Sequence, residues 1–436
     1  MKHYDFIIAG GGAAGLSLAM RLAGSLLPDA SILIVDKDAK DRDDRTWGFW
    51  TDQPTMFEAI AQRSWEQVQI CGEDFNGGPF TRRARLQNYH YQVVRGIDFY
   101  RFAHQELSKH PNVAFRQGSV RRIEDGEEQA HVVVDGQTYS AEWVFDSIFR
   151  PGSFPKDAAR FHHLKLLFKG WEIETPEAAF DPHTVTLLDF RTPQRGDARF
   201  FYVLPYTPHR ALVEYTLFTA ASPGRGEYEA ALQAYVHGML GIQDFDIKKE
   251  ESGGLPVTDL AFPRRVGRRI MTIGNKGGRI KPTTGYAFTR IQRDSDAIIE
   301  SLFKHGHPFD VPEDAQLFRV MDAILLEIMQ QHGDQIRPIF TTLFKNNPIE
   351  RILRFLDEEA SLGEVGALIA SLPPGLFLKT LAKSVKIRSM IWRALGGRMG
   401  LEDWKAGILR HGSVQGLEDW NPSASSGQGL EVRAKS

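Results

Sequence analysis

Hydrophobic and polar residues at the start of the chain follow the pattern of a strand, a glycine turn and a helix. Residues 4–9 (YDFIIA) form a short apolar run that predicts a buried strand. Residues 10–15 (GGGAAG) predict a turn, and residues 16–26 carry apolar side chains at helical spacing. Residues 31–35 (SILIV) predict a second strand, which ends at Asp36. Together these segments predict a strand–helix–strand unit of about 30 residues.

The rest of the chain is strand-rich in its middle and helical toward its end. A helix is predicted over 98–109, and the turn signals "DGEE" and "DGQ" separate the strands that follow. Residues 161–222 are rich in strand patterns, and helical spacing dominates after residue 310. The other predicted elements are strands over 112–123, 130–135, 137–146 and 269–273, and helices over 226–241 and 286–304.

One predicted strand carries a carboxylate at its centre. Residues 210–218 (RALVEYTLF) are β-branched and aromatic, and Pro208 and the Pro223-Gly224 turn bound them. Alternation places Glu214 among apolar residues on one face, while the other face is apolar as well. A strand with two apolar faces is buried on both sides. Glu214 is therefore either a structural partner of a buried arginine or a catalytic group.

Composition limits the classes of protein to which the chain can belong. With 436 residues, 42% hydrophobic and 25% charged, it is an ordinary globular chain of about two to three domains. The net charge of -2 gives no overall field that favours nucleic acid. The single cysteine, Cys71, excludes an internal disulfide, and no metal-ligand spacing stands out. We expect no signal peptide and no transmembrane helix, because Asp5 and the glycines interrupt the N-terminal apolar run.

The glycine turn has the spacing of a dinucleotide-binding fingerprint. Gly10 permits a tight turn, Gly12 lets the backbone approach a pyrophosphate, and Gly15 lets the helix pack on the strand. The helix N-terminus stabilises phosphate charge, and Asp36 can accept hydrogen bonds from a ribose. The residues expected to contact the nucleotide here are Gly10, Gly12, Ala13, Ala14, Gly15, Asp36 and Lys37.

The place of the fingerprint and a later glycine segment favour FAD over NAD. The fingerprint lies at the N-terminus of a long chain, and strand-rich insertions follow it. In FAD proteins of this shape a late strand and glycine segment closes on the flavin, as "RIMTIGNKGG" would here, with Gly274-Asn275 in place of the common Gly-Asp. The N-terminus of the next helix would stabilise an anionic reduced flavin. The expected cofactor contacts are Gly274, Asn275, Thr284, Gly285 and Tyr286.

Four segments in a fixed order resemble those of one enzyme family. "DDRTWGFW" (43–50), "LVEYTLF" (212–218) and "GGRIKPTTGYAF" (277–288) follow the N-terminal fingerprint. With it they resemble the FAD-dependent lycopene cyclases, the bacterial and plant-type enzymes that make β-rings on carotenoids. The resemblance covers residues 1–395.

The resemblance implies cyclisation of lycopene, which is an isomerisation without net redox change. NADPH or NADH would reduce the FAD, and reduced FAD would stabilise a carbocation by its charge. The family's acid lies in a Phe-Leu-Glu-Glu-Thr motif, which reads Leu212-Val213-Glu214-Tyr215-Thr216 here. Glu214 is therefore the expected catalytic acid, and Tyr215 stands where the family has a second carboxylate. Burial would keep Glu214 protonated, as a general acid requires.

Two further segments supply candidate contacts. Arg45, Trp47, Phe49 and Trp50 combine a cation with aromatic rings, whose faces can stabilise a carbocation, although the same residues can form a packed loop. We expect Arg45 at the cofactor and the three aromatic residues at the substrate. Asp146, which ends the strand "EWVFD", is another candidate for cofactor contact.

Residues 365–395 predict contact with a membrane. The uncharged run 365–378 precedes Lys379, Lys383 and Lys386, which fall on one helical face opposite apolar residues. A basic amphipathic helix can lie in a membrane interface, although a packed helix with a solvated face has the same pattern. We expect an acyclic carotenoid such as lycopene as the substrate, taken from lipid. We also expect a peripheral location on the cytoplasmic face of the cell membrane, and no nucleic-acid partner.

These expectations combine into an α/β fold with three parts. A Rossmann-like FAD-binding domain of the flavoprotein-monooxygenase type is joined to a strand-rich substrate domain and a helical C-terminal part. The alternatives are an FAD-dependent monooxygenase or prenyl reductase acting on an isoprenoid, and a non-catalytic lipid- or nucleotide-binding protein. The expected bounds are 1–75, 97–150 and 265–310 for the first domain, 76–96 and 151–264 for the second, 311–400 for the helical part and 412–436 for a disordered tail.

Overall fold

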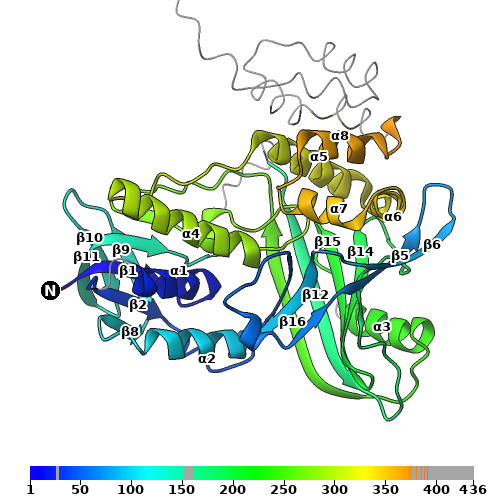
Figure 1. The fold of residues 1–436 in the computed structure, drawn as a ribbon, viewed down its shortest axis with the longest axis horizontal. Coiled ribbons are helices and arrows are strands. Elements are labelled where there is room, and N and C mark those ends of the chain that lie inside the picture. The colour runs from blue at the N-terminus through cyan, green and yellow to red at the C-terminus, as the bar shows by residue number, and fades with distance from the viewer. Residues whose placement is uncertain are drawn as a thin grey trace, which may run out of the picture.

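The computed structural model describes residues 1–25, 29–150, 161–224 and 226–375, with the single residues 380, 384, 387 and 390. The expected tail over 412–436 and most of the expected amphipathic helix lie outside the described residues. The described residues include two seven-stranded sheets, and the one whose strands contain fewer residues is called the smaller sheet and the other the larger sheet. Figure 1 shows the smaller sheet with its helices on one side of the molecule and the larger sheet beside it, with the C-terminal helices along one end of the larger sheet.

The smaller sheet contains the predicted strand–helix–strand unit. β1 (Lys2–Ala9) pairs in parallel with β2 (Ile32–Asp36) and with β11 (Gln137–Asp146), and the apolar run that forms β1 is buried on both faces. In spatial order the strands are β8 (Val113–Gln117), β2 (Ile32–Asp36), β1 (Lys2–Ala9), β11 (Gln137–Asp146), β10 (Ala130–Val134) and β9 (Val120–Glu124), with β17 (Ile270–Thr272) beside β11. The helices packed on this sheet are α1 (Ala13–Gly24), α2 (Gly96–Leu107) and α4 (Phe288–His305).

The larger sheet contains the strand that carries Glu214. Along β15, Leu212 packs toward the C-terminal helices and Val213 packs toward α3 (Glu227–Ala234), so the predicted alternation is confirmed. β5 (Gln67–Glu73) falls within the bounds expected for the first domain, but it pairs with β13 (Thr184–Asp189) in the larger sheet, because an alternating pattern specifies a strand and not its neighbour. In spatial order the strands are β16 (Asp246–Val257), β12 (Leu164–Glu174), β15 (Arg210–Thr219), β14 (Ala198–Thr207), β13 (Thr184–Asp189), β5 (Gln67–Glu73) and β6 (Pro79–Arg85).

A three-stranded sheet and four C-terminal helices complete the described fold. The three-stranded sheet consists of β3 (Thr46–Thr51), β7 (His90–Arg95) and β4 (Arg63–Trp65). The C-terminal helices are α5 (Gln316–His332), α6 (Ile336–Asn346), α7 (Ile349–Leu356) and α8 (Leu362–Ala370). Short helical turns are η1 (Glu58–Ile60), η2 (Tyr235–Met239), η3 (Gly274–Gly277) and η4 (Gly333–Gln335). In the described ranges, no helix has the length and apolar character needed to cross a membrane.

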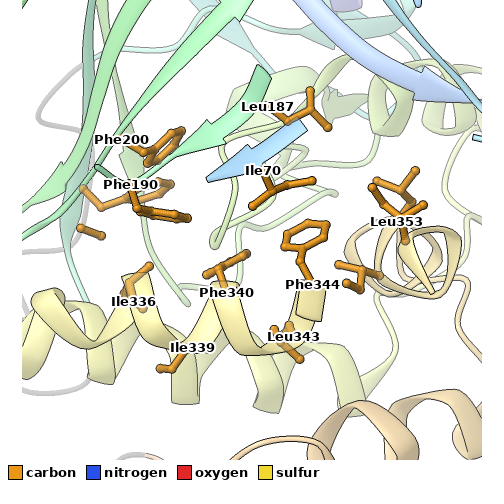
Figure 2. Close-up of a cluster of buried hydrophobic side chains, with 14 of the residues drawn as sticks. Ile70, Leu187, Phe190, Phe200, Ile336, Ile339, Phe340, Leu343, Phe344 and Leu353 are labelled. Atoms are coloured by element: carbon orange, nitrogen blue, oxygen red, sulfur yellow. The ribbon is translucent and has the colours of Figure 1, made fainter. Parts of the chain in front are cut away.

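Helix α6 packs on the larger sheet through a stripe of apolar residues at helical spacing. Figure 2 shows Phe340 and Phe344 on the face of α6 that is turned to the strands, with Phe340 toward Phe190 and Phe344 toward Ile70. The core therefore runs from the strands into the C-terminal helices, and both are parts of one packed unit. The prediction of an α/β fold with a Rossmann-like sheet, a strand-rich unit and a helical end is confirmed.

Two predicted elements are broken where the chain changes partners. The single strand predicted over 112–123 is two strands, because β8 pairs with β2 and β9 pairs with β10 on the other side of the sheet. The helix predicted over 226–241 is α3 followed by the wider turn η2. Hydrophobic spacing alone indicates neither change.

A buried histidine joins the start of the larger sheet to α5. His162 is fully buried, with Nδ1 2.7 Å from an Asp259 carboxylate oxygen and Nε2 2.5 Å from a Glu327 carboxylate oxygen. Burial alone would lower the pKa of His162, but the two carboxylates outweigh it and raise the pKa above its usual value. The imidazolium form is thus an electrostatic link between strand and helix.

This link predicts stability that falls with rising pH. Because the folded pKa of His162 is raised, its contribution is complete below the unfolded pKa of about 6.5 and is lost as pH rises through the folded pKa. Urea unfolding should therefore show a free-energy loss of about 1.4 kcal/mol per pH unit across that window. The His162→Gln variant should lack this slope, while His183→Gln, at an exposed position, should keep it. Equal slopes in wild type and His162→Gln would contradict the assignment.

Candidate active site

Two carboxylates from different strands point into one cavity of the larger sheet. Glu214 on β15 and Glu251 on β16 are both the cross-strand partners of Gly170, on the β12 strand between them. A Cβ on Gly170 would lie 3.4 Å from Cβ of Glu214 and 3.3 Å from Cγ of Glu251. The missing side chain therefore leaves the space over which the two carboxyl groups approach each other.

Glu214 lies in surroundings that favour its protonated form. Burial raises its pKa well above the usual value, and the nearby charge of Glu251 raises the pKa further. The hydroxyl of Thr216 donates to Oε1 of Glu214 at 3.0 Å, and no ion pair joins Glu214 to a cation within the described ranges. Glu214 can therefore carry a proton at neutral pH and donate it inside the cavity.

Glu251 lies beside groups that stabilise a carboxylate. The Thr46 hydroxyl donates to Oε2 of Glu251 at 2.8 Å, and the Lys249 ammonium lies 3.4 Å from the same oxygen. Lys249 is also 2.7 Å from a carboxylate oxygen of Asp43, and both of these side chains are partly exposed. A chain of ionisable groups thus leads from the buried pair to the surface.

Three tyrosines and Trp50 stand beside the carboxylate pair. The Tyr286 hydroxyl lies 3.3 Å from that of Tyr91 and 3.4 Å from that of Tyr202, and Trp50 packs on the Tyr286 ring with centroids 4.7 Å apart. Burial raises the pKa of each of the three tyrosines, so the phenols stay neutral. They form a polar boundary that carries no charge.

This boundary separates two cavities. The cavity of about 270 Å³ contains Glu214 and Glu251. The other, of about 50 Å³, has almost entirely apolar walls from the strands and from α5 to α7, including labelled residues of Figure 2. Tyr202, Thr284 and Tyr286 line both. Acid groups thus adjoin a narrow apolar space.

The glycine turn forms an open anion site beside the first sheet. Gly10 has a φ of 108°, and a Cβ at Gly15 would lie 1.9 Å from the Gly10 carbonyl oxygen, so both positions require glycine. No described side chain caps α1, whose N-cap is Gly12, and no described atom lies within 4 Å of a Cβ placed there. The free N–H groups and open space fit a pyrophosphate.

Asp36 and the late glycine segment extend this site. The Asp36 carboxylate accepts the N–H of Gly11 at 2.6 Å and that of Asp38 at 2.8 Å, which leaves capacity for ribose hydroxyls. Gly274 has a φ of 59°, and its Cβ position lies 2.6 Å from Cβ of Ala14, so the two glycine segments meet. These residues fit a bound dinucleotide.

The other residues expected at the cofactor fall in different surroundings. Arg45 lines the larger cavity and lies 3.1 Å from Asp44, whereas Lys37 is exposed. The Asp146 carboxylate is buried, pairs with Lys276 and accepts the N–H of Ile148 at 2.9 Å. The cavity wall also includes Asn275, Thr284, Gly285 and Tyr286.

The aromatic residues expected at the substrate divide between three places. Trp47 lines the larger cavity, and Trp50 lines the apolar cavity while its indole N–H donates to Asp357 at 2.6 Å. Phe49 stacks on Phe288 in the core of the first unit, with centroids 4.8 Å apart. Alternation along β3 separates Trp50 from Trp47 and Phe49, which share one face of the strand and both pack on Phe288.

Sequence reasoning missed four contributors to the site. Glu251 and Tyr202 reach the cavity, and Gly170 comes to lie between the two acids, only through the strand order of the larger sheet, whereas Tyr91 reaches the cavity from β7 of the three-stranded sheet. The segment "KKEESGG" around Glu251 looks like an exposed charged strand, so no local pattern marks its acid as special.

Comparison with known proteins gives a family and individual relatives whose descriptions agree. The family described as lycopene cyclase protein matches residues 5–382. The lycopene beta-cyclase of Pantoea ananas is 24% identical over 300 residues, which cover 65% of this chain and 71% of that protein. The chloroplastic lycopene beta cyclase of Arabidopsis thaliana is 24% identical over 334 residues, which cover 70% of this chain and 61% of that protein. The match thus spans less than two thirds of the plant protein.

Solved structures share the fold at low sequence identity. A flavin-dependent brominase gives a TM-score of 0.55 at 14% identity, with 88% of this chain and 99% of the other covered. A geranylgeranyl bacteriochlorophyll reductase-like protein from Thermoplasma acidophilum gives 0.53 at 14% identity, with 90% and 100% covered. The chain therefore has the fold that these proteins share, and the predicted flavoprotein-monooxygenase type of fold is confirmed.

Proposed function

The chain belongs to the lycopene cyclase protein family, and from this premise we propose that it is a lycopene β-cyclase. It would convert the linear ends of lycopene, or of a related acyclic carotenoid, into β-rings without net redox change. The observation that carries the proposal is Glu214, an acid with a raised pKa in a cavity that adjoins a narrow apolar one. A hydrocarbon offers no polar group to recognise, so it needs apolar walls and a proton donor.

The residues on the cavity wall have defined roles in this reaction. The Glu214 carboxyl would give its proton to the terminal double bond, forming a C–H bond and a tertiary carbocation. The π electrons of a second double bond would close the ring, and loss of a ring proton would form the ring double bond. The aromatic faces of Trp47 and Tyr286, which line the cavity, would stabilise the positive charge.

The glycine segments and Asp36 would position the cofactor. FAD in its reduced form would supply a negative charge opposite the carbocation. The free N–H groups of α1 and the Asp36 carboxylate would hold its pyrophosphate and ribose, and the segment from Gly274 to Tyr286 would border the ring system. NADPH or NADH would be the reductant that maintains the reduced state.

We place the protein at the cytoplasmic surface of the cell membrane, bound peripherally. A carotenoid has almost no solubility in water, so it must reach the enzyme from lipid. The apolar cavity lies against α5 to α7, and the basic residues from Lys379 onward follow these helices in the sequence. Basic and apolar residues together favour an anionic membrane surface.

Anaerobic turnover tests the function directly. Flavin-loaded protein, incubated without oxygen with lycopene in liposomes and chemically reduced FAD, should give γ-carotene and β-carotene, measured by pigment chromatography, without stoichiometric oxidation of the flavin. A prenyl reductase would consume NAD(P)H in step with product, and a monooxygenase would need oxygen. Absence of cyclised product from flavin-loaded protein would contradict the proposal.

A further inference from the structure

We infer that Glu214 and Glu251 work as one acid–base pair, in which Glu214 gives the proton that starts cyclisation and Glu251 accepts the proton that the ring loses. This inference rests on the proposed cyclase function and adds a second catalytic group to it. The second carboxylate comes from a different strand, and not from the position next to Glu214.

The sheet geometry explains why Glu251, and not residue 215, is the partner. Tyr215 points to the opposite face of β15, where its hydroxyl lies 3.1 Å from Arg199. A carboxylate at position 215 would therefore be far from the cavity. β12 lies between β15 and β16, and each strand is about 4.8 Å from its neighbour, so the backbones that carry the two acids are not adjacent. Because β12 has Gly170 at the crossing point, the two side chains meet above it.

The surroundings divide the roles between the two acids. Glu251 receives a hydrogen bond from Thr46 and lies beside the Lys249 ammonium, so negative charge is stabilised there. Among the described residues Glu214 has only the Thr216 hydroxyl as a donor and no ion-pair partner. When two nearby carboxyl groups differ in this way, the proton stays on the one without the cation.

The proton balance closes without an outside reagent. The O–H bond of Glu214 breaks as a C–H bond forms on the terminal alkene carbon. The ring C–H bond then breaks, its electron pair becomes the ring double bond, and the proton goes to the Glu251 carboxylate. A carboxyl-to-carboxylate transfer returns that proton to Glu214. Exchange with solvent would occur through Lys249 and Asp43, whose side chains are 23% and 22% exposed.

Replacement of Glu251 by glutamine tests the pair through the pH dependence of turnover. Loss of the negative charge should lower the pKa of Glu214, so the alkaline limb of the kcat profile should move to lower pH. The value of kcat should fall about 10²-fold, because the ring proton loses its acceptor. Glu250→Gln is the matched control, since Glu250 points to the other face, pairs with Lys169 at 2.9 Å and should keep both the rate and the profile.

An infrared titration of the flavin-loaded protein without substrate gives a readout that does not depend on turnover. The C=O stretch of a buried carboxylic acid should be present in wild type at neutral pH and absent from Glu214→Gln. In Glu251→Gln this band should disappear at a lower pH than in wild type. If the band titrated at the same pH in wild type and Glu251→Gln, or if the kcat profile of Glu251→Gln were unchanged, the assignment of an acid–base pair would be wrong. Absence of turnover by wild type would instead contradict only the cyclase function.

Discussion

Lycopene-accumulating cells that express the Glu214→Gln variant are expected to keep their lycopene, whereas cells with the wild-type chain should accumulate cyclised carotenoid. The amide has nearly the size of the carboxyl group but holds no proton that it can donate. General acids contribute up to about 10⁴-fold to a rate. We expect a loss at that upper limit, because ring closure and proton loss both depend on the carbocation that the protonation forms. Pigment chromatography measures the ratio of cyclic to linear carotenoid.

The matched control for this variant is Tyr215→Phe on the same strand. Tyr215 faces away from the cavity, so its replacement should leave the pigment pattern unchanged. Bound flavin in both purified variants, measured by its absorbance, shows that the fold and the cofactor site persist. Normal β-carotene production by Glu214→Gln would remove this residue from the mechanism.

Lys281→Met is expected to lower the free energy of unfolding by about 3–5 kcal/mol, because it leaves the buried Asp322 carboxylate without its cation. The Lys281 ammonium is buried and lies 2.8 Å from Asp322 on α5 and 2.8 Å from Glu358 after α7. Its backbone N–H also donates to the Tyr286 carbonyl at 2.9 Å, so this residue anchors the loop that lines both cavities. Urea unfolding of the flavin-loaded protein measures the loss.

An exposed ion pair provides the comparison for Lys281. Arg85 lies 2.8 Å from Glu66, and both side chains are more than 60% exposed. Arg85→Met should therefore cost less than about 1 kcal/mol. If the two variants were destabilised equally, burial of the Lys281 network would not be the cause.

Local sequence signals predicted the elements whose roles depend on neighbours along the chain. The glycine turn lies between β1 and α1 as expected, because a tight turn, a helix start and an acid are all encoded within one strand–helix–strand unit. The strand around Glu214 was predicted over 210–218 and is observed as Arg210–Thr219, since alternation and flanking prolines are also local signals.

Contacts between distant segments were beyond such reasoning. The meeting of Glu214 with Glu251 needs β12 to lie between β15 and β16, and strand order is fixed by the packing of the whole sheet. The placement of β5 in the larger sheet has the same origin. The departure at Tyr215 suggested a site with one acid, because the motif alone does not reveal what the neighbouring strands contribute.

The position of β16 at the edge of the larger sheet has a consequence for solubility. An edge strand exposes unpaired N–H and C=O groups that another chain could extend into a continuing sheet. Lys248, Lys249, Glu250 and Glu251 place charges of both signs along this edge, and Glu251 points inward. Another strand that paired here would have to bury those charges. The charged segment that supplies Glu251 therefore also protects the sheet against aggregation.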